Sequence, residues 1–129
     1  MSDLYDTCVF IDYWRGDTGA VALIESVRAG EKSASYSSLS ATELWQYPKL
    51  GRQEEVEFVA LTSYFLQEAT LSTAAAIKAG QWLRPLSRSA RMRVAADALI
   101  AATAEEREER VRTRNLKDFQ KFYSNIQTY

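Results

Sequence analysis

The chain has 129 residues, of which 47% are hydrophobic and 26% are charged, and its formal net charge is −1. This length and composition fit a single globular domain with a sizeable hydrophobic core, which we expect to span residues 1–129. The near-neutral charge excludes a global field that would draw the protein to nucleic acid or to an anionic membrane, so any nucleic-acid contact has to come from a local patch.

In chain order, the expected elements are a strand at 4–6, helices at 7–15 and 17–29, a strand at 32–37, helices at 40–47 and 54–64, a strand at 69–71, a helix at 72–83, a helix around 94–104, a strand at 110–113, a helix at 116–123 and an edge strand at 126–129. Apolar residues recur with helical spacing in the helices, and Ser, Asp or Asn residues are placed to cap several of them. Because strands alternate with helices, the pattern predicts an α/β fold with a mostly parallel central sheet.

Residue types that are rare or missing narrow the chemistry. The sequence contains no histidine, which excludes Ser-His-Asp hydrolysis, Cys-His proteolysis and His-ligated zinc. Its single cysteine, Cys8, forms no intrachain disulfide and fits a reducing compartment. No stretch has the pattern of a signal peptide or the length of a membrane span, so we expect a cytoplasmic protein.

Asp97 is the most informative residue. It is the only charge in the apolar, Ala-rich run 94–104, which is too short to cross a bilayer and reads as a buried helix. An ionised carboxylate left alone there would cost several kcal/mol, so it has to be neutralised, paired or bound to a metal. A salt bridge to Arg93, four residues earlier, is the simplest alternative to a metal.

Three further acids are expected near the same edge of the sheet. Asp6 ends the first strand, while Glu43 and Asp118 are predicted in the first turns of helices that follow strands, and Asp97 is predicted near the start of its own helix. Strand C-termini and helix N-termini meet at the ligand-binding edge of such sheets. The four carboxylates are therefore expected to converge.

Converging carboxylates would repel one another unless a cation neutralised them. Oxygen ligands without His or Cys favour hard ions, Mg²⁺ or Mn²⁺. Such an ion can activate a water and stabilise charge on a phosphoryl group, so phosphodiester hydrolysis is the natural reaction.

Each acid also has a local structural explanation. Asp6 could cap the first helix, and Glu43 could be the reciprocal member of a capping box with Ser40. Asp118 could complement the dipole of a helix capped by Asn115. Thr7 and Thr113 could bond carboxylates or metal-bound water, or only nearby backbone. Asp12 is expected on an exposed helix face, Cys8 in the core, and the three tryptophans in the core or at an interface.

Four motifs resemble those of PIN-domain nucleases, especially VapC-type toxins of type II toxin–antitoxin systems. They are residues 4–16 (LYDTCVFIDYWRG), 40–44 (SATEL), 96–104 (ADALIAATA) and 113–119 (TRNLKDF). Their order and spacing match over nearly the whole chain. The resemblance implies a PIN-like α/β/α sandwich with helices on both faces of the sheet. It also implies Mg²⁺- or Mn²⁺-dependent endoribonuclease activity on RNA, a homodimer and inhibition by a cognate antitoxin.

By matching position, the resemblance makes Asp6, Glu43 and Asp97 the core catalytic and metal-binding acids. Many members have Asp where this chain has Asn115, so Asp118, one helical turn further on, is expected to take the fourth catalytic and metal-binding place, with Asn115 supporting. A catalytically weak module of the same fold that only binds RNA or protein is the alternative function. A nuclease acting on DNA is a third interpretation.

The segment 84–93 carries four arginines and no acid and leads into the helix of Asp97. We expect it to contact RNA phosphates through Arg84, Arg88, Arg91 and Arg93. A solvated loop, or ion pairs with the chain's own acids or with the antitoxin, is the alternative interpretation.

Overall fold

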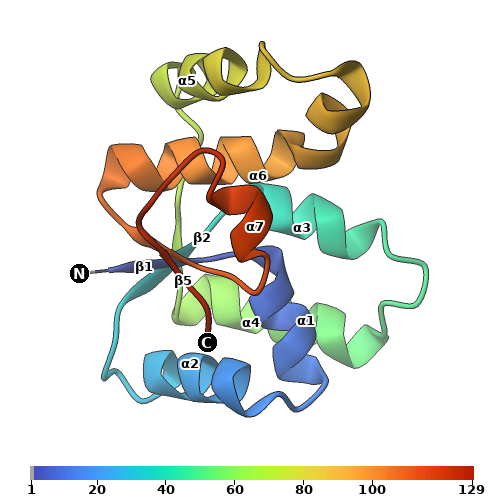
Figure 1. The fold of residues 1–129 in the computed structure, drawn as a ribbon. Helices are drawn as coiled ribbons and strands as arrows, with labels where there is room; N and C mark the ends of the chain where they lie inside the picture. The colour runs from blue at the N-terminus through green and yellow to red at the C-terminus, as the bar shows by residue number, and fades with distance from the viewer. Residues whose placement is uncertain (1) are drawn as a thin grey trace.

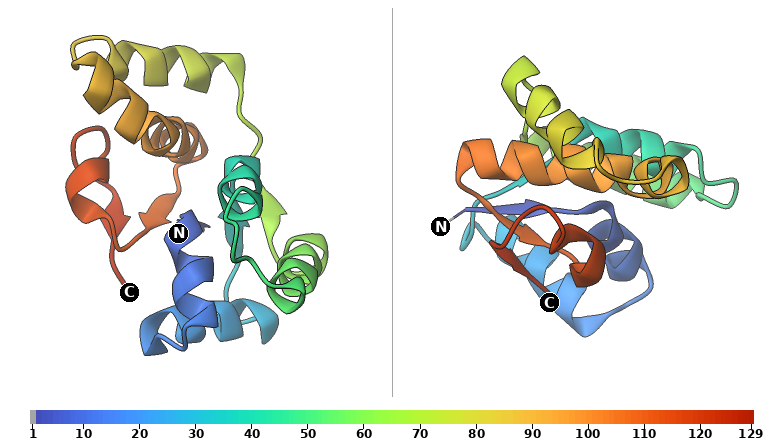
Figure 2. Two further views of the ribbon diagram at one scale, coloured as in Figure 1. Left: turned by 90° about the vertical axis from the view of Figure 1, so that its right-hand side faces the viewer. Right: turned by 45° about the horizontal axis from the view of Figure 1, so that its top comes forward.

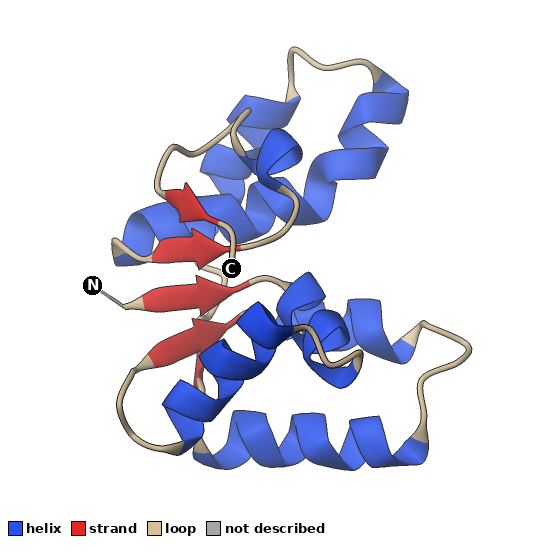
Figure 3. Cartoon of the chain, turned by 60° about the horizontal axis from the view of Figure 1, so that its bottom comes forward, coloured by secondary structure: helices blue, strands red, loops and turns tan. Residues whose placement is uncertain are grey.

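Five parallel strands in the order β3-β2-β1-β4-β5 form the centre of the structure, a computed structural model that describes residues 2–129 (Figure 1). The elements are β1 (Asp3–Tyr5), α1 (Thr7–Trp14), α2 (Thr18–Arg28), β2 (Ala34–Tyr36), α3 (Ser38–Trp45), α4 (Arg52–Tyr64), β3 (Gln67–Glu68), α5 (Thr73–Leu83), α6 (Arg88–Arg107), β4 (Arg110–Arg112), α7 (Leu116–Phe119) and β5 (Ile126–Gln127). Figure 3 shows the strands side by side, with their arrowheads toward the same edge. The predicted α/β class with a parallel central sheet is confirmed.

Helices cover both faces of this sheet. Successive residues of the central strand β1 point to opposite faces, as strand geometry requires. Tyr5 packs with apolar residues of α1, α2, α3 and α4, whereas Leu4 packs with residues of α6, β4 and α7. In Figures 1 and 2 the helices α2 and α6 accordingly lie on opposite sides of the strands.

Helix α5 forms an additional outer layer on α6. Ala75 and Ala79 of α5 pack with Ala98 and Ala102 of α6, and all four side chains are buried. Figure 2 shows α5 lying over α6 on the side away from the sheet. The outer helix explains why the middle of α6 is apolar almost all round, because one side of α6 faces the sheet and another faces α5.

Several predicted boundaries are wrong. Helix α3 begins at Ser38 with Ser37 as its N-cap, so Ser40 is inside the helix and the predicted capping box does not form. Glu43 therefore lies in the second turn of α3, and Asp97 lies in the middle of the 20-residue α6 instead of near its start. Strand β3 comes two residues before the predicted strand at 69–71.

The segment 84–93 is mostly helical rather than a loop. Arg84 is the C-cap of α5, while Arg88, Arg91 and Arg93 belong to the first two turns of α6. The last helix is shorter than expected and ends at Phe119. In residues 2–129 no helix has the length and apolar character needed to cross a membrane.

Candidate active site

A cavity of about 390 Å³ opens at the carboxyl ends of β1 and β4, between α1, α3 and α6. Its lining residues are Asp6, Thr7, Cys8, Ile11, Glu43, Asp97, Arg114 and Asn115. Asp6 directly follows β1, and the loop that follows β4 carries the residues from 113 to 115. Three of the four acids singled out from the sequence thus border one cavity, although they come from three distant parts of the chain.

Asp6 is the most deeply buried of these acids. Its Oδ1 accepts the backbone N–H of Thr7 at 2.8 Å, and its Oδ2 accepts the hydroxyl of Thr113 at 2.8 Å and the thiol of Cys8 at 3.4 Å. Burial raises the pKa of this carboxyl, although these three hydrogen bonds oppose the shift. The local explanation of Asp6 as the N-cap of α1 also holds, since it accepts from the first turn.

Glu43 is held by a threonine rather than by a helix terminus. The hydroxyl of Thr7 donates to Glu43 Oε1 at 2.9 Å and lies 2.8 Å from Ser40 Oγ, which is fully buried. Burial raises the pKa of Glu43, the hydrogen bond from Thr7 opposes this, and the charge of Asp6 raises it further. Thr7 therefore links α1 to α3 and fixes the distance between two acids of the site.

Asp97 projects from α6 and lies among other negative charges. Burial is the largest cause that raises its pKa, from an ordinary 3.8 to about 7, and neighbouring negative charges add to it. In decreasing order these charges are Asp6, Asp118 and Glu43. The charge of Arg93 opposes this shift, and the Nδ2 of Asn115 donates a hydrogen bond to Asp97 Oδ2 at 3.2 Å.

Asp118 occupies a different position from the other three acids. It lies in the first turn of α7 and is not among the lining residues of the cavity. Its Oδ1 accepts from Arg93 at 2.9 Å and lies 3.6 Å from the ammonium of Lys121, and the hydrogen bond from Arg93 is the main cause that lowers its pKa. Asn115 donates to both Asp97 and Asp118, so its amide bridges the two acids. Asn115 is the N-cap residue of α7, as expected, but its side chain makes no capping hydrogen bond.

The arginine segment divides into two groups. Arg93 pairs with Asp118, not with Asp97 as the alternative interpretation required. Arg84, Arg88 and Arg91 are exposed and have no ion pair within residues 2–129. None of the four borders the cavity.

The position of Asp12 contradicts the sequence prediction. It is 5% exposed instead of lying on a solvated face, and it accepts hydrogen bonds from Arg114 and from the Tyr129 hydroxyl, the latter at 2.6 Å. Arg114 lines the cavity and was not singled out from the sequence. Its position between Thr113 and Asn115 in the last motif could have indicated that Arg114 lies at the site. Its ion pair with Asp12 could not be predicted in the same way, because the two residues are 102 positions apart in the sequence. Cys8 is half-buried at the cavity wall rather than in the core.

The donor set suits a hard divalent cation. Apart from the thiol of Cys8, the ligating atoms around the cavity are carboxylate, hydroxyl and amide oxygens, which Mg²⁺ and Mn²⁺ prefer. A cation would relieve the repulsion that raises the pKa of Asp97. As the side chains stand, no group of three or more His, Cys, Asp or Glu residues in 2–129 is close enough to hold an ion.

Comparison with known proteins places the chain in a family. The model of the PIN domain family matches residues 4–124. A toxin–antitoxin complex from Klebsiella pneumoniae contains a chain with 24% identity and a TM-score of 0.69, and the match covers 98% of this chain and 96% of that one. No curated protein sequence matches significantly.

Two further solved structures share the fold. The VapBC2 complex of Rickettsia felis, bound to a DNA fragment from its promoter, has a TM-score of 0.71 at 17% identity, with 100% of this chain and 99% of that chain covered. A structure of FitAcB from Neisseria gonorrhoeae has a TM-score of 0.64 at 21% identity, with 100% and 96% covered. PIN domains are generally nucleases. With the family model matching nearly its whole length, this chain belongs to the PIN domain family.

Proposed function

We propose that this protein is a divalent-metal-dependent endoribonuclease and the toxin of a toxin–antitoxin pair, acting as a single domain. The observation that carries the proposal is the cavity itself. Carboxylates from the end of β1, from α3 and from α6 border it, and burial, with the negative charges of the neighbouring acids, raises the pKa of Asp97 to about 7. Groups with such perturbed pKa values in a cleft are typical of functional sites.

Asp6, Glu43 and Asp97 would hold Mg²⁺ or Mn²⁺. When bound, such an ion supplies an activated water and stabilises the charge on the phosphoryl group. Thr7 and Thr113 keep two of the carboxylates oriented by donating to them. A bound cation would favour the charged form of Asp97, which burial and the neighbouring acids disfavour.

Two residues, Asn115 and Asp118, are candidates for the fourth position of the acidic site. Asn115 borders the cavity and donates its amide to Asp97, whereas Asp118 lies outside the cavity lining and is ion-paired with Arg93. We propose that Asn115 supports Asp97 directly and that Asp118 assists through its negative charge. Arg84, Arg88 and Arg91, which are exposed, would contact RNA phosphates. For Arg93 that role would require release from Asp118.

The toxin role is supported by the solved structures that share the fold, which include a toxin–antitoxin complex and VapBC2 bound to promoter DNA. We propose by extension a cognate antitoxin as partner, a homodimer and a cytoplasmic location. A chain free of its antitoxin should then cleave RNA.

Cleavage of single-stranded RNA in Mg²⁺ or Mn²⁺, stopped by EDTA, is the first expected result. The variant Asp97→Asn should fold normally but lose cleavage by about a hundredfold or more, since it removes the charge that a cation would meet. Asp17→Asn is the matched control. Asp17 is exposed, caps α2 and lies outside the cavity, and Asn is an equally good N-cap. Full activity of Asp97→Asn would refute the site assignment.

The same assay distinguishes the proposed endonuclease from the alternative function, a module that binds RNA without cleaving it. Binding of RNA without cleavage, at saturating metal and without antitoxin, would support a catalytically weak binding module, for which the replacement of an acid by Asn115 is the favouring observation. Cleavage of matched DNA strands in preference to RNA would reassign the substrate.

A further inference from the structure

A second cavity lies directly beside the acidic one. Its volume is about 180 Å³, and it shares the side chains of Ile11 and Glu43 with the acidic cavity. The loop that joins α3 to α4, at the right-hand edge of Figure 1, provides its outer wall through Tyr47, Lys49 and Leu50. A group placed in this cavity would therefore be a close neighbour of a phosphate at the carboxylates.

The walls of this cavity are aromatic and aliphatic. Trp14 forms one side, and its ring is fixed because the indole N–H donates to Glu57 Oε1 at 2.7 Å. Tyr47 contributes a second ring, which is 53% exposed, and Leu44 and Leu50 complete the apolar lining. An exposed tyrosine beside a rigid apolar slot gives a flat ligand a surface on which to stack.

The rim of the cavity carries charges that are not used by the fold. Arg15 and Lys49 are exposed and have no ion pair in the described chain. Free cations beside an apolar slot are suited to the phosphates on either side of an inserted base. The Glu54 carboxylate, close against Gly51 at the start of α4, offers an acceptor for the amino group of a base edge.

We propose that this second cavity binds one unstacked nucleobase of the RNA strand, adjacent to the phosphate that is cleaved. The inference rests on the proposed function and names how the same site selects its substrate. The cavity is too small for a drug-sized ligand but suits a single planar group. Proteins that read single-stranded RNA splay bases out onto aromatic rings and bond their edges in this way.

A base fits the observations better than a side chain of a protein partner. The slot lies beside the acidic cavity and shares the side chains of Ile11 and Glu43 with it, so one strand can place its phosphate in one and its base in the other. The two unpaired cations at the rim complement a phosphate backbone. Base preference of the cleavage should therefore depend on Tyr47 and on the acceptor of Glu54.

The test measures RNA binding in EDTA, so that cleavage does not interfere. Fluorescently labelled single-stranded RNAs, each with an abasic site at a different position, are titrated with the wild type, Tyr47→Ala and Tyr64→Ala. Tyr64 is the matched control, because it is 81% exposed at the end of α4 and outside both cavities.

The wild type and Tyr64→Ala should lose about tenfold in affinity when one particular base is missing, the effect of a lost stacking partner. Tyr47→Ala should bind the intact RNA about tenfold more weakly and be insensitive to the loss of that base, because both changes remove the same contact. Tyr47→Ala could instead bind the intact RNA as tightly as Tyr64→Ala does and lose as much affinity when the base is missing. That result would overturn the inference and favour a protein partner as the occupant of the cavity.

Cleavage of the same intact RNAs in Mn²⁺ is scored separately. Base-dependent binding through Tyr47 without any cleavage would overturn the endonuclease proposal and support the base site. Cleavage with no dependence on Tyr47 would overturn the base site alone. A wild type that neither binds nor cleaves RNA would overturn both.

Discussion

Asp97 shows how a single residue can be unfavourable for folding and useful for binding. Its carboxylate is half-buried beside like charges and has one amide donor, so its pKa rises to about 7. Apolar neighbours in α6 would lose nothing if this position were alanine, and no ion pair within residues 2–129 involves this carboxylate. Such a cost is expected where a ligand, rather than the fold, requires the side chain.

Asp12 supports the site from behind without bordering it. It receives the guanidinium of Arg114 and the hydroxyl of Tyr129, and the backbone N–H of Arg114 donates to Cys8 Sγ at 3.3 Å. These contacts fasten the loop after β4 to α1. Because that loop carries Asn115, Asp12 is a positioning residue for the donor that holds Asp97.

The variant Asp12→Asn should lower kcat for RNA cleavage by about ten- to a hundredfold, the usual cost of removing a partner that orients a ligand-holding group. KM should change little, because Asp12 does not border either cavity. The measurement is steady-state cleavage with a thermal unfolding curve on each variant.

Tyr129→Phe is the control for this change. It removes the other hydrogen bond to Asp12 but leaves the ion pair with Arg114, so its kcat should stay near that of the wild type. A folded Asp12→Asn variant with unchanged kcat would contradict the positioning role.

How well single residues could be predicted depended on how local their explanation is. Asp97 was predictable because its apolar neighbours in sequence already make its charge anomalous. The burial of Asp12 was not, because its partners lie 102 and 117 residues further along the chain. The arrangement of Asn115 between two acids also needed the fold, since its amide could equally have capped α7.

At the scale of elements, alternation of strands and helices was predictable, but the exact helix ends were not. Ser37 and Ser40 offer the same hydroxyl, and only the end of β2 at Tyr36 decides that the first of them caps α3. The length of α6 exceeded the prediction because the arginines before its apolar run are also good helix formers. The exact ends of these helices depend on tertiary structure, so sequence periodicity alone does not predict them.

Helix α4 is tied to the first two helices by one carboxylate. Glu57 accepts from the hydroxyl of Tyr13 at 2.9 Å, from the indole of Trp14 at 2.7 Å and from Arg28 at 2.7 Å. Burial would raise the pKa of Glu57, but these donors, Arg28 foremost, lower it overall. The charged form of Glu57 is therefore stabilised in the folded protein.

Glu57→Gln should lower the free energy of unfolding by about 1–2 kcal/mol at pH 7, because the amide cannot accept all three bonds of the carboxylate. Glu25→Gln is the matched control, since Glu25 is an exposed partner of the same Arg28 and such surface pairs contribute about 0–1 kcal/mol. Urea unfolding of both variants measures the difference. Equal stabilities of the two variants would contradict the role of Glu57 as the tie between these helices.

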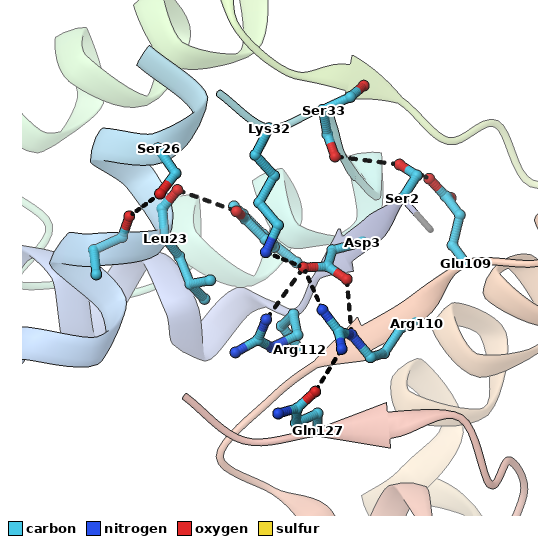
Figure 4. Close-up of polar contacts among 12 residues, drawn as sticks. Ser2, Asp3, Leu23, Ser26, Lys32, Ser33, Glu109, Arg110, Arg112 and Gln127 are labelled. Carbon is cyan, nitrogen blue, oxygen red and sulfur yellow. Dashed lines mark hydrogen bonds and ion pairs between the residues drawn. The ribbon is translucent and has the colours of Figure 1, made fainter. Parts of the chain in front are cut away.

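Two clusters of charged residues, the acidic cavity and the cations around Asp3, lie at opposite ends of the strands of the sheet. The acidic cavity lies at the carboxyl ends of the strands, whereas Asp3 at the start of β1 is surrounded by cations (Figure 4). Asp3 is fully buried. Its Oδ2 lies 2.7 Å from Lys32 and 3.3 Å from Arg112, and its Oδ1 lies 2.9 Å from Arg110.

The electrostatics of this second cluster favour folding near neutral pH. Burial opposes ionisation of Asp3, but the hydrogen bonds and charges of Arg110 and Lys32 outweigh it and lower its pKa below the ordinary 3.8. The unfolded chain therefore takes up a proton at this residue before the folded chain does. The stability that Asp3 contributes is present above pH 3.8 and is lost as the pH falls through its lowered value.

Asp3→Asn should consequently lower the free energy of unfolding by about 3 kcal/mol at pH 7, because it leaves three cations facing one another without their common partner. The difference from the wild type should shrink as the pH is lowered below 3.8, where the wild-type carboxyl also becomes neutral. Denaturant unfolding across this pH range measures it, and RNA cleavage by the folded variant should be unchanged because Asp3 lies at the other end of the sheet. A stability difference that is absent at pH 7, or that grows on acidification, would show that Asp3 is not the anion that holds this end of the sheet together.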